Sequence, residues 1–167
     1  MKNRYLSFPL AVLAMLLSSL CAFAQFKVYR GDSTSWTKII CSYKGGKLYA
    51  GDTTSDWTKI IYTYKDGKWY EGDSTSWTNV RFTVSDHKLY KGDSTSWTNV
   101  LLTYSDGKIY SGDSTSWTKV CLTYDDGKLY RGDSTSWTNV VVTFSGEPSE
   151  DFLLGFAYIF LRADCVK

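Results

Sequence analysis

The chain has 167 residues, with 19 basic side chains, 17 acidic side chains and a single histidine. Two of the basic residues, Lys2 and Arg4, lie in the first 24 residues, which hold no acid, so 17 basic and 17 acidic side chains follow them. A neutral chain has no bulk electrostatic attraction for nucleic acid or an anionic membrane, and we expect neither as a partner. The length beyond residue 24 suits one domain.

Residues 1–24 have the pattern of a secretory signal peptide. A basic start is followed by a mostly apolar segment over 6–17, and Ala22-Phe23-Ala24 matches a cleavage site. We therefore expect a protein that is secreted or periplasmic after cleavage near Ala24. Cys21 raises the alternative of a lipoprotein anchor, but Leu20 stands where such signals have a small residue. No later segment reaches the roughly 18 apolar residues of a membrane helix, so we expect no transmembrane segment.

From Gln25 onward the sequence repeats a phrase of about 20 residues, G-D-S-T-S-W-T-x-V-x-x-T-Y-x-D-G-K-x-Y-x. One tyrosine marks each copy: Tyr29, Tyr49, Tyr70, Tyr90, Tyr110 and Tyr130. The spacing is 20 residues except for one step of 21, where Asp56 is inserted. Such self-similarity is typical of a repeat architecture, in which each unit buries its apolar face against its neighbours. Residues present in six copies favour a structural role, because one active site does not need six copies.

Each repeat predicts a β-hairpin. The segment from Trp97 to Tyr104 is rich in β-branched and aromatic residues and predicts a first strand. An Asp-Gly pair such as Asp106-Gly107 follows, and this pair favours a type I′ turn, whose two central residues both have positive φ. K-x-Y forms the second strand, and G-D-S-T-S closes the unit as a connection rich in turn residues.

Alternation along the first strand predicts a core face and a water face. One set of positions carries no charge in any repeat, and we expect it to face the core. Its members are Ile39, Ile60, Val80, Val100, Val120 and Val140, then Cys41, Tyr62, Phe82, Leu102, Leu122 and Val142, then Tyr43, Tyr64, Val84, Tyr104, Tyr124 and Phe144. The intervening positions tolerate Lys38 and Arg81 and include Cys121, so we expect them to meet water. Trp69, which replaces an aliphatic residue of a second strand, is expected in the core.

The two ends of the repeat region each hold half a hairpin. Phe26 to Tyr29 matches a second strand without its first, and Trp137 to Phe144 matches a first strand without its second. Pairing these halves completes a sixth hairpin and closes a ring of about twelve strands, which removes exposed sheet edges. An open array of repeats is the alternative.

The tail after the repeats predicts an apolar helix. Pro148, Glu150 and Asp151 favour a helix start, and Phe152 to Leu161 is apolar on every side, so this helix must be buried. A ring of twelve strands is too wide for its own side chains to fill. We therefore predict a mainly β fold, with a signal peptide over 1–24, a closed six-hairpin barrel over 25–146, and a helix over 147–167 that plugs its centre. A buried strand in the tail is the alternative.

The K-x-Y-x-G-D-S-T and D-G-K motifs, together with the apolar tail, resemble the β-flower repeat proteins from Phe26 to about Leu161. This resemblance implies short hairpins arranged as petals around a shallow barrel with an apolar channel. The layout is also similar to the tubby C-terminal barrel, which implies lipid binding only by analogy. Two weaker resemblances are to the MORN repeat, over Tyr62 to Gly72, and to choline-binding solenoids, but their paired glycines and G-W dipeptide are absent.

The tryptophans at the starts of the first strands are the candidate ligand-binding residues. They are Trp36, Trp57, Trp77, Trp97, Trp117 and Trp137. Beside serine and threonine hydroxyls, an indole can stack on a sugar ring or enter a lipid interface. The alternative, which sixfold repetition favours, is that each indole packs on a tyrosine of the next hairpin as a seam between petals.

Other repeated polar positions have structural interpretations. The aspartates of G-D lie in six separate loops, so we expect turn capping rather than a cation site; they are Asp32, Asp52, Asp73, Asp93, Asp113 and Asp133. We expect the lysines of K-x-Y to be solvated beside the hairpin turns; they are Lys27, Lys47, Lys68, Lys88, Lys108 and Lys128. Arg30-Gly31-Asp32 and Arg131-Gly132-Asp133 match the integrin-recognition tripeptide. Because the arginine position varies in the other repeats, we interpret this match as chance.

Cysteine and histidine are too few to indicate a metal site or a catalytic site. Cys41, Cys121 and Cys165 follow the signal peptide, and we predict that any disulfide joins Cys165 to Cys41 or Cys121. The single histidine, His87, occupies a turn-glycine position and is expected at the surface. No Ser/His/Asp arrangement or phosphate-binding loop stands apart from the repeats. We expect no metal, no cofactor and no enzymatic activity.

These observations favour a secreted, monomeric, non-catalytic protein that acts as a binding or cell-envelope module. We expect a glycan or another small extracellular ligand at the rim where the six tryptophan loops converge, because weak contacts in many copies add. The alternatives are a purely structural secreted protein and a tubby-like lipid-binding barrel. The breaks in the repeat at Asp56, Trp69, Arg81 and His87 fall mainly in the second and third repeats, which indicates that one side of the ring differs.

Overall fold

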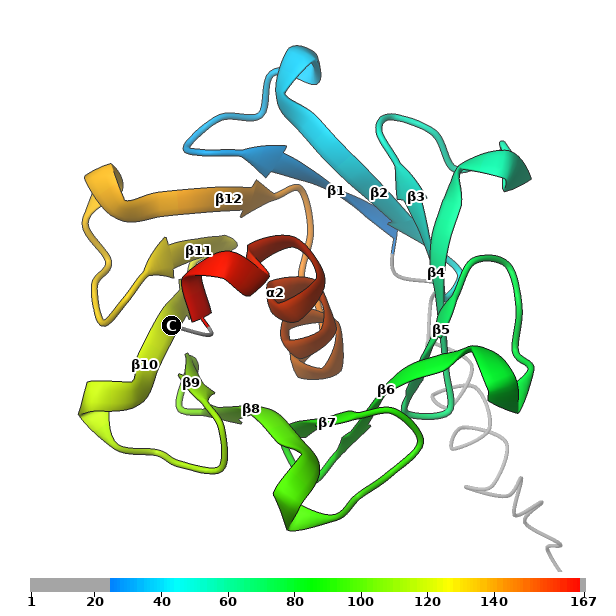
Figure 1. The fold of residues 1–167 in the computed structure, drawn as a ribbon. Helices are drawn as coiled ribbons and strands as arrows, with labels where there is room; N and C mark the ends of the chain where they lie inside the picture. The colour runs from blue at the N-terminus through cyan, green and yellow to red at the C-terminus, as the bar shows by residue number, and fades with distance from the viewer. Residues whose placement is uncertain (1–24, 166–167) are drawn as a thin grey trace, which may run out of the picture.

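Twelve antiparallel strands form one closed barrel in the computed structural model, which describes the backbone of residues 25–165 and the side chains of residues 25–161 (Figure 1). The predicted signal peptide over 1–24 lies outside the described residues. The strands are β1 (Gln25–Arg30), β2 (Ile39–Lys44), β3 (Lys47–Ala50), β4 (Ile60–Lys65), β5 (Lys68–Glu71), β6 (Val80–Ser85), β7 (Lys88–Lys91), β8 (Val100–Ser105), β9 (Lys108–Ser111), β10 (Val120–Asp125), β11 (Lys128–Arg131) and β12 (Val140–Phe144).

The first and last strands close the barrel. Val28 of β1 pairs with Phe144 of β12, and Tyr29 pairs with Thr143. This register is the one found inside a continuous hairpin, where Leu48 pairs with Tyr43. The two half-hairpins at the chain ends therefore form the predicted sixth hairpin, and the open-array alternative is wrong.

The hairpin turns have the predicted left-handed backbone at both central residues. Asp66 and Gly67 have φ of 51° and 75°. His87 takes the same conformation in place of glycine, with φ of 60°. Two successive residues with positive φ define the type I′ turn, whose twist matches that of the flanking strands. The Asp-Gly signal is confirmed.

A bulge at every junction between hairpins corrects the predicted faces of the first strands. Tyr29 pairs with Ile39 but Val28 pairs with Cys41, so Ile40 is an extra residue in β2. The same shift occurs at the other five junctions. Because an extra residue breaks the two-residue alternation, Ile40 packs partly buried against the central core, whereas Ile39 and its counterparts do not. Cys121, expected on the water face, also packs against the core.

A single turn of 3-10 helix precedes each first strand. These turns are η1 (Trp36–Lys38), η2 (Trp57–Lys59), η3 (Trp77–Asn79), η4 (Trp97–Asn99), η5 (Trp117–Lys119) and η6 (Trp137–Asn139). The tryptophans therefore lie in 3-10 turns, and the strands that we predicted to start at them begin three residues later.

Helix α2 (Glu150–Cys165) runs through the centre of the barrel (Figure 1). The Ser149 hydroxyl accepts a hydrogen bond from the Phe152 N–H at 3.2 Å and so caps the first turn. Phe152 and Phe156 are 1% and 0% exposed inside the ring of strands. The plugging helix is confirmed, and the alternative of a buried strand is wrong. Among the described residues, none of the helices has the length and apolar character needed to cross a membrane.

One side chain of the wall and one glycine of the helix fit together in the core. Trp69 of β5 is fully buried, as predicted. A Cβ at Gly155 of α2 would lie 2.2 Å from the Trp69 ring, so only glycine leaves room for this indole. The Trp69 Nε1 has no hydrogen-bond partner, which shows that the ring is held by packing alone.

Candidate functional site: a ring of six petals

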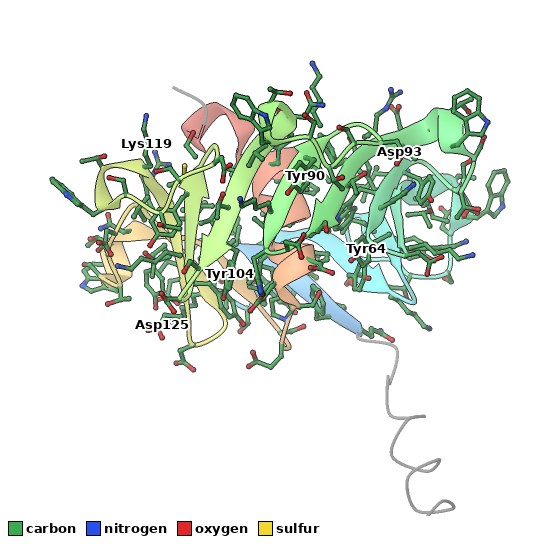
Figure 2. All side chains as sticks on the ribbon, turned by 90° about the horizontal axis from the view of Figure 1, so that it is seen from below. Tyr64, Tyr90, Asp93, Tyr104, Lys119 and Asp125 are labelled. Carbon is green, nitrogen blue, oxygen red and sulfur yellow. The ribbon has the colours of Figure 1, made fainter. Side chains whose placement is uncertain are left out.

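Six connections between successive hairpins protrude around the circumference of the barrel (Figure 1). We call them petals; they span residues 31–38, 51–59, 72–79, 92–99, 112–119 and 132–139. All six leave the same end of the barrel, the petal rim, and the hairpin turns form the opposite end, the turn rim. Figure 2 shows the two ends, with Lys119 of a petal near one and Asp125, beside a turn, near the other.

A buried hydroxyl holds the base of each petal. The Thr103 hydroxyl donates to the Gly112 carbonyl at 2.8 Å, and Gly112 itself has φ of 69°. The same bond joins Ser42 to Gly51, Thr63 to Gly72, Thr83 to Gly92, Thr123 to Gly132 and Thr143 to Gly31. This hydrogen bond, present in all six repeats, thus anchors the start of each petal to the wall.

The tyrosine that marks each repeat is buried on the outer face of the wall. Tyr49 is 8% exposed, and its neighbour Leu48 belongs to the central core. Because successive side chains of a strand point to opposite faces, the tyrosine lies outside the barrel, below the petal. The six tyrosines therefore give the petals an apolar base of their own.

The repeated lysines and aspartates form a closed ring of ion pairs. Each lysine of K-x-Y pairs with the G-D aspartate of the next repeat and not with the one that follows it in its own, as Lys27 does with Asp52, at 2.6–2.8 Å. Lys128 and Asp32 close this ring between the last repeat and the first. A hydrogen bond to the aspartate raises the pKa of each lysine. The lysines and aspartates are still 29–50% exposed, but beyond the expected solvation and turn capping they form pairs that tie each short strand to a petal of the next repeat.

Short-range hydroxyl bonds order the petal tips. In five petals the serine before the tryptophan lies 3.0–3.1 Å from the hydroxyl of the threonine after it, as in Ser96 and Thr98. In the remaining petal the inserted Asp56 takes the place of that serine and accepts from the Thr58 N–H at 3.0 Å. These bonds lower the pKa of Asp56. The insertion is thus absorbed as an N-cap of η2.

The tryptophans stand out in solvent at the petal tips. Their exposed fractions lie between 74% and 80%. The predicted seam, in which each indole packs on the next hairpin, is wrong. The tips leave one rim, as expected, but they spread outward around the ring instead of converging (Figure 1). The result is six separate aromatic faces, each beside a hydroxyl pair.

The residues that break the repeat do not gather in one site. Arg81 Nε donates to the Glu71 carboxylate at 2.7 Å on the petal rim. His87, at the surface as predicted, lies on the turn rim with its Nδ1 2.7 Å from the Glu150 carboxylate. Tyr64 donates to the Asp151 carboxylate on the same rim, and burial together with this bond raises the pKa of Tyr64. These contacts on the turn rim fix the start of α2 against the barrel.

The cysteines occupy different environments. Cys41 is unpaired and fully buried in the wall, and burial raises its pKa to about 12. Cys121 is partly buried near the petal rim. The side chain of Cys165 lies outside the described part of the chain, so a bridge from Cys165 to Cys41 or Cys121 stays a prediction. Among the described residues, no group of three His, Cys, Asp or Glu side chains is placed to hold a metal ion.

These features define a closed sixfold barrel of hairpins with a helical plug and outward petals. A family model described as 6-fold beta flower protein matches residues 14–120 and 83–148. The chain belongs to this family, which confirms the resemblance seen in the K-x-Y-x-G-D-S-T and D-G-K motifs. No curated protein and no solved structure gives a significant match.

Proposed function

We propose that the protein is a secreted or periplasmic, monomeric, non-catalytic module that binds glycans through the tryptophans of its petals. The observation that carries the proposal is the exposure of all six indoles, between 74% and 80%. Tryptophan is highly buried on average in folded proteins, so indoles with this exposure are the more informative feature. Here the exposure recurs in every repeat, so it is a property of the unit.

The chemistry of each tip suits a neutral sugar. An indole offers a flat apolar face on which the C–H face of a sugar ring can stack. Beside it, the Ser96 and Thr98 hydroxyls, 3.0 Å apart, can exchange hydrogen bonds with sugar hydroxyls. The residue that ends the 3-10 turn is lysine in three petals and asparagine in three, so a positive charge is not a feature that the six tips share.

The geometry favours a repeating polymer over one small ligand. The tips point away from one another around the ring, so each contact is separate (Figure 1). Weak contacts on one rigid body add through effective concentration when the ligand repeats along its length. The threonine–glycine bonds and lysine–aspartate pairs hold the petals in place before binding, which reduces the entropy lost in the complex.

The alternative of a tubby-like lipid carrier has less support. Helix α2 fills the channel, and its residues Leu154 and Phe156 are fully buried. Carriage of lipid through the whole channel would require displacement of this core. A purely structural role remains as the outcome that follows if no glycan binds.

A glycan array tests the proposal, followed by titration of the best polysaccharide. The triple variant Trp36→Ala, Trp77→Ala, Trp117→Ala should lose about a hundredfold or more in avidity, and Trp97→Ala alone should lose less, because the contacts are multivalent. Asp125→Ala, on the turn rim, is the matched control and should bind as the parent. Undiminished binding by a triple variant that melts at the parental temperature would exclude the petals as the site.

A further inference from the structure

The last residue of each short strand forms a ring around the mouth of the barrel at the petal rim. Arg30 follows the core residue Val28 by two positions, so both point to the inner face of the wall. The same holds in each repeat. The ring consists of Arg30, Ala50, Glu71, Lys91, Ser111 and Arg131. Unlike the petals, this ring has no sixfold symmetry, and its chemistry changes from one side of the mouth to the other.

Closure of the barrel brings two arginines of this ring to the same side. Arg30 ends β1 and Arg131 ends β11, and both strands pair with β12. The two arginines line a cavity of about 400 Å³ between the wall and the last turns of α2. Its other lining residues are apolar and include Val141 and Val142 of β12 and Phe156 and Phe160 of α2.

The opposite side of the mouth is different. There a separate cavity of about 290 Å³ is lined by Arg81, Lys91 and Tyr158, and Arg81 is paired with Glu71. Five strands lie between β6 and β12 in either direction around the ring, so the two cavities lie on opposite sides of α2. The combination of two arginines with an apolar floor therefore occurs on the β11–β12–β1 side.

We propose that the cavity beside β12 binds a single-chain amphiphile with an anionic head group. The floor is apolar and open to a ligand, since Ile40, Val141 and Phe160 line the cavity and are only partly buried, and an alkyl chain would lie against them. The arginines at the mouth would hold the carboxylate or phosphate, which their planar guanidinium groups fit in a two-pronged geometry. A volume of 400 Å³ falls within the range of roughly 300–1,000 Å³ that is usual for small-molecule pockets.

This site also explains the two R-G-D matches in structural terms. Their arginines turn inward to the cavity, while their aspartates pair outward, Asp32 with Lys128 and Asp133 with Lys108. The three residues of each match therefore do not act as one recognition loop. The site is independent of the petal tryptophans, and α2 stays in place as its floor.

The test is calorimetric titration of the purified protein with dodecanoate, below its micelle concentration, and with dodecanol as the neutral match. We expect one equivalent of dodecanoate to bind and dodecanol to bind much more weakly. Arg30→Ala should weaken dodecanoate binding about tenfold or more, since a charge-assisted contact is lost, and Arg30→Lys should restore part of it. Lys91→Ala, at the same repeat position on the opposite side, is the control and should change nothing.

A second variant tests the apolar floor. Val141→Trp should fill the cavity and abolish binding, with thermal melting to confirm that the variant is folded. Flotation with phosphatidylglycerol vesicles separates two sources of the same chemistry: binding to vesicles alone, lost in Arg30→Ala, would assign the site to an anionic lipid held in a bilayer. If neither probe binds, or if binding is equal in Arg30→Ala, Lys91→Ala and the parent, the proposal is wrong.

Discussion

At the scale of single residues, hydrogen bonding explains why certain residue types recur at the same position of every repeat. The buried threonine hydroxyl of each wall strand and the glycine carbonyl of each petal base satisfy one another, as Thr103 and Gly112 do at 2.8 Å. A buried carbonyl without a donor costs free energy, so replacing the hydroxyl residue alone would destabilise the fold. Ser42 stands in place of threonine in the first repeat and makes the same bond at 2.9 Å. What the repeat keeps is therefore the hydroxyl.

The variant Thr103→Val tests this pairing. It keeps the shape of the side chain but leaves the Gly112 carbonyl without its donor, so we expect a loss of about 1–2 kcal/mol in the free energy of unfolding. Thr103→Ser, the natural residue of the first repeat, should lose much less. Urea denaturation of both variants measures the difference, and equal stability of the two would show that the hydroxyl does not matter.

Trp69 and Gly155 form the tightest contact between wall and plug. In Gly155→Ala the new methyl group would overlap the Trp69 ring, and overpacking of this kind costs about 1–3 kcal/mol. Trp69→Leu introduces the residue found at the equivalent positions Leu48, Leu89 and Leu129 and makes room for that methyl group. In the double variant the cost of Gly155→Ala should largely vanish. A double-mutant cycle on denaturation free energies with no coupling would contradict the contact.

Because the Cys41 thiol is buried, we expect the free energy of unfolding to fall at high pH. Burial raises its pKa from 9.0 to about 12, so the unfolded chain releases this proton at a lower pH than the folded protein does. The contribution to stability is complete below pH 9 and falls by about 1.4 kcal/mol per pH unit up to pH 12. Cys41→Val, with the residue of the sixth repeat, should be relatively more stable above pH 9. Parallel denaturation curves for parent and variant between pH 8 and pH 11 would refute this.

At the scale of elements, the six bulges are the feature of the structure that the sequence did not predict. Local sequence patterns predict the hairpins, their type I′ turns and the plugging helix. These patterns are the Asp-Gly pairs, the alternating apolar residues and the all-apolar tail. No local sequence pattern marks the bulge at Ile40 and its counterparts, because the bulge arises where one hairpin pairs with the next. It changes the side of the wall on which Ile39 and Cys121 lie, and alternation alone cannot reveal that change.

Helix α2 is an element that the barrel requires. Its aromatic residues form a stacked column, with Phe152 and Phe156 centroids 5.7 Å apart and Phe156 and Phe160 centroids 4.8 Å apart. A chain truncated after Phe144 should therefore be aggregated or molten, as judged by near-UV circular dichroism and light scattering. Phe156→Ala should fold but lose about 3–5 kcal/mol. A truncated protein that melts cooperatively at the parental temperature would show that the wall stands without its plug.

At the scale of the whole molecule, closure decides which sites exist. The half-hairpins at the chain ends could be matched from the sequence because each has a partner elsewhere in the repeat. The candidate sites could not be derived in the same way. The petal tryptophans were found by repetition, but their exposure depends on how the 3-10 turns leave the wall. Arg30 and Arg131 are 101 positions apart in the sequence and line one cavity only because β1 and β11 both pair with β12.

Removal of β1 is the direct test of closure. Without residues 25–30 the barrel loses the ladder in which Val28 pairs with both Phe144 and Cys41, and β2 and β12 become free edges. Free edges template pairing between chains, so we expect the variant to form dimers or larger species in sedimentation velocity runs. The Lys128–Asp32 pair would then have to bridge the gap between the two edges of an open sheet.

A matched variant separates the loss of edge pairing from the loss of core volume. Val28→Ala removes buried side-chain atoms but keeps every backbone hydrogen bond of β1, so it should lower the melting temperature and stay monomeric. The deletion variant should both unfold earlier and associate. If the deletion variant is monomeric and melts at the temperature of Val28→Ala, then β1 serves only to fill the core, and the fold of the other eleven strands does not depend on closure of the barrel.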